Sequence, residues 1–104
     1  MWNVRWSYSA ELQYTNVLTF WIKHNLSNTY SQKIVTAVEE AEDILTENPY
    51  IFEEKEDYKN GVLFKYRKLI ILNNFSLIYI IRESVEIVAF WDNRQDPDKL
   101  KELL

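Results

Sequence analysis

The stretch FWDNRQDPDKL, residues 90–100, has the densest group of side chains in this sequence that could do chemistry. It places Asp92, Arg94 and Asp96 directly after two large aromatic residues. Two carboxylates can act as acid and base, and an arginine can stabilise a developing negative charge. Acids in a loop before a helix are more often turn formers and helix caps, and exposed ion pairs beside them are common and weak. Taken alone, the stretch is therefore interpreted as a turn.

A second charged group has four bases and no acid within residues 58–72: Lys59, Lys65, Arg67 and Lys68. The preceding segment, 39–57, has nine of the sixteen acids and a single base. The net charge of −4 is atypical of a general polyanion binder, but a basic patch can still act locally. Because side chains alternate along a strand, we expect Arg67 and Lys68 to point to opposite faces, with Tyr66 beside Lys68.

Composition excludes several classes of chemistry. There is no cysteine, and the single histidine, His24, cannot form a metal site by itself. One glycine is too few for a phosphate-binding glycine loop or a nucleophile elbow. No segment resembles a signal peptide or reaches the length of a membrane-spanning helix. We therefore expect no metal, no cofactor and no membrane partner, and a cytoplasmic location.

The length of 104 residues and the hydrophobic content of 47% predict one domain, residues 1–104, with one core. Residues 2–7, WNVRWS, alternate apolar and polar side chains and predict a first strand. An apolar stripe then predicts a helix that Ser9 caps and that ends within residues 23–28.

A second helix is predicted from Ser27 or Thr29 onward, because apolar residues recur at spacings of three and four. Asn48 and Pro49 should end it, since proline disfavours a helical conformation in the preceding residue. Only a few polar residues connect the two helices, so they should pack as an antiparallel hairpin.

The remaining segments predict a crossing loop at 50–61, strands at 62–72, 75–83 and 84–92, and a short last helix with Asp96 as its cap and Pro97 at its first position. The three strands are closely spaced and should form an antiparallel meander. The predicted class is α+β, in the order β-α-α-β-β-β, with the helical hairpin packed on one face of an antiparallel sheet and a short C-terminal helix.

This order of elements, together with five short motifs, resembles the RelE/ParE superfamily of toxins, the plasmid stabilisation proteins of type II toxin–antitoxin systems. The motifs are VRWSYSAELQ at 4–13, YSQKI at 30–34, ILTENP at 44–49, YRKLIILNNFSLIYII at 66–81 and IVAFWDNRQDPDKL at 87–100. Their order and spacing cover essentially the whole chain, although each motif is short.

The resemblance implies one of two activities. RelE-like members cleave messenger RNA in the decoding site of the ribosome, and ParE-like members inhibit DNA gyrase without being nucleases. Both kinds are neutralised by a cognate antitoxin whose C-terminal segment folds onto the toxin. A third alternative is a non-toxic relative that only binds a partner protein.

The nuclease pattern of the family implies charge-stabilising, catalytic roles for Arg67, Lys68 and Arg94. It also calls for an arginine on the middle strand of the meander and an acid–base residue near the C-terminus, where this sequence has Ser76 and Leu100. Attack by a ribose hydroxyl needs a proton acceptor, so these departures favour ParE-like binding over RelE-like cleavage.

Two further sets of residues follow from the resemblance. In a nuclease, the missing proton acceptor would have to be replaced by Tyr66, Tyr79 or Asp92. In either kind of toxin, the end of the last strand is expected to contact the partner through Trp91, Asn93 and Arg94.

Overall fold

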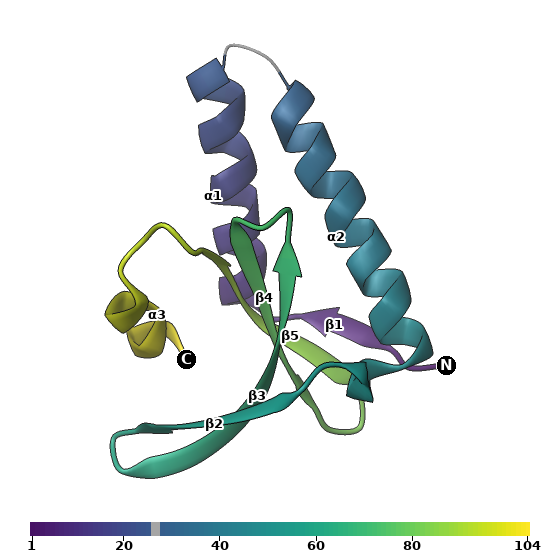
Figure 1. Cartoon of the computed structure of the whole chain (residues 1–104), viewed down its shortest axis with the longest axis vertical. Helices are drawn as coiled ribbons and strands as arrows, with labels where there is room; N and C mark the ends of the chain where they lie inside the picture. Colours follow the sequence, from purple (N-terminus) through teal and green to yellow (C-terminus); the bar gives the residue numbers. More distant parts are fainter. Residues whose placement is uncertain (26–27) are drawn as a thin grey trace.

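The chain folds as a five-stranded mixed sheet with a helical hairpin on one face (Figure 1). The computed structural model describes residues 1–25 and 28–104, without the side chains of residues 101 and 103. The elements are β1 Val4–Trp6, α1 Tyr8–Asn25, α2 Thr29–Glu47, a 3-10 turn Pro49–Ile51, β2 Glu54–Lys59, β3 Val62–Ile71, β4 Phe75–Ile81, β5 Val85–Asp92 and α3 Pro97–Leu103. The strand order is β1-β5-β4-β3-β2, with β1 parallel to β5 and the other neighbours antiparallel. The predicted α+β class is confirmed, but the prediction of a wholly antiparallel sheet was wrong, because β1 pairs with β5 in parallel.

The first helix begins earlier than the sequence predicted. Strand β1 ends at Trp6, and the hydroxyl of Ser7 accepts a hydrogen bond of 3.0 Å from the backbone N–H of Ala10. Ser7 is therefore the cap, and the prediction of Ser9 was wrong. Ser9 lies inside the first turn, where its hydroxyl accepts a hydrogen bond from the side chain of Gln13.

The second helix has the predicted end. It begins at Thr29, one of the two predicted starts, and the other, Ser27, lies outside the described residues. It ends at Glu47, because Asn48 is extended with φ −155° and ψ 92°, as expected before Pro49. The two helices lie side by side as an antiparallel hairpin (Figure 1).

The segment predicted as a crossing loop, 50–61, contains strand β2. The sheet therefore has one more strand than was predicted. The prediction was wrong because both faces of this strand are charged, and the usual alternation of apolar and polar residues is absent. Asn60 and Gly61 close the hairpin to β3 with φ of 53° and 77°. Positive φ at both central residues is typical of a type I′ turn, which matches the twist of paired strands.

The predicted meander is confirmed as β3, β4 and β5. One irregularity was not predicted: Ile78 pairs with Ala89 and Tyr79 with Ile87, so Val88 is an extra residue in β5. Such a bulge breaks the alternation of faces. As a result, Ile87 and Phe90 both belong to the core under the helices, although they are three residues apart.

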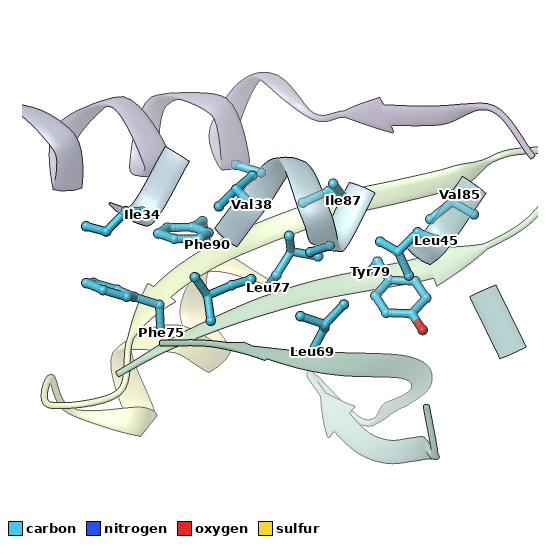
Figure 2. Close-up of a cluster of buried hydrophobic side chains, with 13 residues drawn as sticks. Ile34, Val38, Leu45, Leu69, Phe75, Leu77, Tyr79, Val85, Ile87 and Phe90 are labelled. Atoms are coloured by element: carbon cyan, nitrogen blue, oxygen red, sulfur yellow. The ribbon is translucent and has the colours of Figure 1, made fainter. Parts of the chain in front are cut away.

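The core lies between the helices and the sheet, as Figure 2 shows. Its labelled residues are Ile34, Val38 and Leu45 of α2 together with Leu69, Phe75, Leu77, Tyr79, Val85, Ile87 and Phe90 of the sheet. The Tyr79 hydroxyl donates a hydrogen bond of 2.7 Å to the carbonyl of Pro49, which anchors the turn after α2 to β4. Within residues 1–25 and 28–104, no helix has both the length and the apolar character needed to cross a bilayer.

Candidate functional site

The second face of the sheet is not covered by the helical hairpin, and we call it the open face. Strand register brings side chains of three strands together there, since Lys68 of β3 pairs with Ile78 of β4, and Ser76 of β4 pairs with Trp91 of β5. Directly paired residues share a face. Helix α3 covers part of this face, where Leu100 contributes to the same pocket as Lys68 and Ser76.

A pocket of about 220 Å³ lies between the open face and α3, and we call it the open-face pocket. It is lined by Asp57, Tyr66, Lys68, Ser76, Ile78, Trp91, Asn93, Gln95, Pro97, Leu100 and Leu104. A wider hollow of about 610 Å³ shares Tyr66 and Leu104 with it, and its lining also includes Arg67 and Tyr79 from the other face of β3 and β4. The open face is therefore concave where α3 packs on it, and polar residues of β2, β3 and β4 and of the turn after β5 line the open-face pocket.

Polar groups of the open-face pocket are partly paired with one another. Ser76 is 1% exposed, and its hydroxyl donates a hydrogen bond of 2.6 Å to Oδ1 of Asn93. Trp91 is 8% exposed, and its indole Nε1 is buried with no hydrogen-bond partner in the part of the chain that the structure describes. A buried N–H without a partner is rare and costs free energy.

Arg94 does not line this pocket. Its guanidinium binds both carboxylate oxygens of Asp92 at 2.8 and 2.7 Å. Its Cζ lies 5.1 Å from the ring centre of Trp21 and 5.8 Å from that of Phe75, a core residue under the helices. The side-chain hydrogen bonds from Arg94 hold the pKa of Asp92 below its usual range, against the opposing effect of partial burial. The structure thus has the turn pair that the sequence alone indicated.

Arg67 is engaged on the face opposite to Lys68, as the alternation predicted. It donates a hydrogen bond to the carbonyl of Phe52 and lies 3.7 Å from a carboxylate oxygen of Glu54. Its Cζ is 5.3 Å from the ring centre of Tyr50, and its side chain is only 16% exposed. The side chain therefore joins β3 to the segment that follows α2.

The three predicted catalytic residues are consequently not brought together. Lys68 alone lines the open-face pocket, while Arg67 and Arg94 pair with carboxylates elsewhere. Of the predicted partner-binding residues, Trp91 and Asn93 line the pocket and Arg94 does not.

The three substitute proton acceptors are also separated. Tyr79 lies in the core, where burial raises the pKa of its hydroxyl to about 12. Asp92 is bound to Arg94, and only Tyr66 lines the open-face pocket. Sequence reasoning missed Asp57 as a lining residue because β2 was not predicted as a strand. Within the described residues, no group of three histidine or acidic side chains is placed to hold a metal ion.

Fold and site define this chain as an α+β protein with one helix-covered sheet face and one concave, partly open face. No protein-family model matches the sequence, and a search of curated proteins gives no match.

Proposed function

We propose that this chain is a cytoplasmic toxin of the RelE/ParE kind that is neutralised by a cognate antitoxin. It acts by binding an essential target such as DNA gyrase, and it needs no metal or cofactor. One observation carries the choice of binding over cleavage: Arg67 and Arg94 are each paired with a carboxylate, away from Lys68.

The chemistry of RNA cleavage explains why this separation matters. Attack by a ribose hydroxyl on the adjacent phosphate builds negative charge, which several converging cations would have to stabilise, and it needs a base to take the proton. Among the described side chains, the open-face pocket offers one lysine, Lys68, and, of the three substitute acceptors, Tyr66. Inhibition by binding needs a complementary surface rather than converging catalytic groups, and the concave open face is the candidate for that surface.

Two assays on the purified chain separate the activities. We expect inhibition of gyrase supercoiling and no new cleavage of a messenger RNA that is being translated. Cleavage without an effect on gyrase would overturn the proposal in favour of a RelE-like nuclease. The best observation for that alternative is that Tyr66 and Lys68 line the same pocket.

Growth after tightly induced expression tests toxicity itself. Arrest of growth that co-expression of the antitoxin relieves is the expected result. No arrest and no effect in either assay, with soluble protein and intact binding of a partner protein, would favour the non-toxic relative.

A further inference from the structure

The sheet is split between β3 and β4. Their pairing ends at Arg67 and Tyr79, so that, among the described strands, residues 62–66 of β3 pair only with β2 and residues 80–81 of β4 pair only with β5. Figure 1 shows the β2–β3 hairpin leaving the sheet on one side while β4 and β5 continue on the other. We call the space between residues 62–66 and residues 80–81 the strand gap. The wider hollow of about 610 Å³ lies there, because residues of both segments line it.

The β-bulge in β5 accounts for the split. Its extra residue, Val88, lies between the pair of Ile78 with Ala89 and the pair of Tyr79 with Ile87, and Tyr79 also forms the last pair with β3. A bulge bends its strand and increases the local twist. The ends of β4 and β5 therefore turn away from β3, and Val88 lines the hollow that results.

Two hydrogen bonds show the direction of the backbone groups of β4. The N–H of Val85 donates to the carbonyl of Asn3, so Val85 points away from β4, and its register partner Ile81 points away from β5. In the same way, the N–H of Phe90 donates to a side chain of α1, so its register partner Leu77 also points away from β5. Ile81 therefore faces the strand gap, and Leu77 faces β3.

The same alternation extends to β3. Leu77 pairs with Leu69, whose backbone groups therefore face β4. Since the direction alternates along a strand, Lys65 and Leu63, four and six residues earlier, face the same side, beyond the point where β4 pairs with β3. The N–H and C=O groups of Leu63, Lys65 and Ile81 thus point into the strand gap, where no described strand pairs with them.

We infer that the strand gap binds an extended segment of a protein partner, which adds to β3 as a further strand. A peptide backbone offers both donors and acceptors at the spacing that an open strand edge needs. Residues 62–66 provide an edge for about five residues of such a segment, or ~17 Å. The inference rests on the proposed function only for the existence of a protein partner.

The outer edge of β2 is less suited to such an addition. The backbone N–H of Tyr58 already donates to the carboxylate of Asp57, at 2.8 Å. Most residues of β2 are charged, and charged side chains on an edge strand disfavour the addition of another strand. The strand gap is therefore the preferred edge.

The side chains around the strand gap predict the pattern of the segment. On the open face, the rings of Phe64 and Tyr66 stack with their centres 5.6 Å apart, and Ile80 and Val88 line the same hollow. On the other face, the side chain of Lys65 is 55% exposed. Directly paired residues share a face of the sheet. The segment should therefore alternate apolar residues, which contact the open face, with polar residues on the side of Lys65.

Amide hydrogen exchange measured by NMR tests the strand addition residue by residue. The probe is an acetylated and amidated hexapeptide of alternating valine and glutamate. In the free protein, the amides of Leu63 and Lys65 should exchange faster than those of Phe64 and Tyr66, which face β2. At a peptide concentration nine times the Kd, exchange at Leu63 and Lys65 should slow about tenfold, with a smaller change at Phe64 and Tyr66.

Two controls separate backbone pairing from contact through side chains. The same peptide methylated at every backbone nitrogen keeps its side chains but has no N–H groups, and it should not slow the exchange. Phe64→Thr should weaken binding of the unmodified peptide about tenfold, because it removes apolar surface that the valines contact. Val62→Thr is the matched control, since Val62 lies on the same face outside the lining of the hollow, and it should bind as the wild type does. The spread of amide resonances shows whether each variant is folded.

Three results would each overturn the inference. The first is equal protection by the methylated peptide, and the second is wild-type binding by Phe64→Thr. The third is protection of Leu63 and Lys65 without peptide, either at all protein concentrations, which would show a closed gap, or rising with concentration, which would show pairing with a second copy. Peptide binding is measured without a toxicity assay, so failure of the strand gap and failure of the toxin proposal can be told apart.

Discussion

Arg94 binds Asp92 through two parallel hydrogen bonds and at the same time lies over the ring of Trp21. The backbone N–H of Arg94 also donates to the same carboxylate, at 2.9 Å. These contacts tie the turn after β5 to α1 on the helix side of the sheet. The arginine at the end of this apolar strand therefore has a structural role, because its contacts close the turn.

Replacement of Arg94 by alanine should lower the free energy of unfolding by about 1 kcal/mol, because nearly half of the side chain is in solvent, where ion pairs are weak. Arg94→Lys keeps the charge but loses the two-point contact and the planar stacking. We expect it to lose most of the same free energy in urea unfolding. A lysine variant as stable as the wild type would show that the paired geometry contributes nothing.

Acid should remove the contribution of the Asp92 pair. The pKa of Asp92 is lowered in the folded protein, so this contribution is fully present above the ordinary aspartate pKa and is lost as the pH falls through the folded value. The difference in free energy of unfolding between wild type and Asp92→Asn should be constant above about pH 5 and shrink below about pH 4. Urea unfolding over this pH range measures it, and a constant difference down to strong acid would contradict it.

The two serines at the start of α1 should differ in their effect on stability. Ser7→Ala leaves the N–H of Ala10 without its cap and should cost about 1 kcal/mol. Ser9→Ala, the matched control, removes only an exposed contact with Gln13 and should change stability by less than about 0.5 kcal/mol. Thermal unfolding of both variants measures these changes. Equal losses of stability would indicate that Ser9 caps the helix, as the sequence predicted.

The fold was largely predictable because most elements have a clear pattern and a clear end. Pro49 ends α2, the capping residue Asp96 starts α3, and each strand of the meander lies within its predicted range, one or two residues shorter than predicted. Strand β2 was not predictable in this way, since it owes its conformation to pairing with β3 and its own residues are mostly charged. The strand conformation of β2 therefore follows from its tertiary pairing, because the local pattern of its residues does not predict a strand.

The site was only half predictable for a related reason. Alternation along a strand correctly separated Arg67 from Lys68 and joined Lys68 to Tyr66. The pairing of Ser76 with Asn93, and the burial of the Trp91 indole, depend on the register of β4 with β5 and on where α3 lies. The spacing of residues within a single segment predicts neither the hydrogen bond between Ser76 and Asn93 nor the burial of the indole.

Alkaline pH should destabilise the protein through two tyrosines. Burial raises the pKa of Tyr14 and of Tyr79 to about 12, so their contributions are present below the ordinary value of about 10 and are lost as the pH rises from there to about 12. Titration of tyrosinate absorbance should show two groups with a pKa of about 12. Tyr79→Phe and Tyr14→Phe should each remove one of these groups, and titration of Tyr14 and Tyr79 near the ordinary value would contradict the prediction.

The neighbours Arg67 and Lys68 should respond to substitution in opposite ways. Arg67→Met loses the hydrogen bond to the Phe52 carbonyl and the ion pair with Glu54, and it should cost about 1 to 3 kcal/mol because the side chain is mostly buried. Lys68→Met removes no ion pair within the described residues, so its stability should stay within about 0.5 kcal/mol of the wild type.

Urea unfolding of the two variants compares their free energies of unfolding. This comparison decides how a loss of function in either variant is interpreted. A loss of partner binding in a stable Lys68→Met protein points to the open-face pocket, whereas the same loss in Arg67→Met follows from a weakened fold. If Lys68→Met were the less stable variant, Lys68 would be a structural residue, because its removal would then disturb the packing of α3 on the sheet.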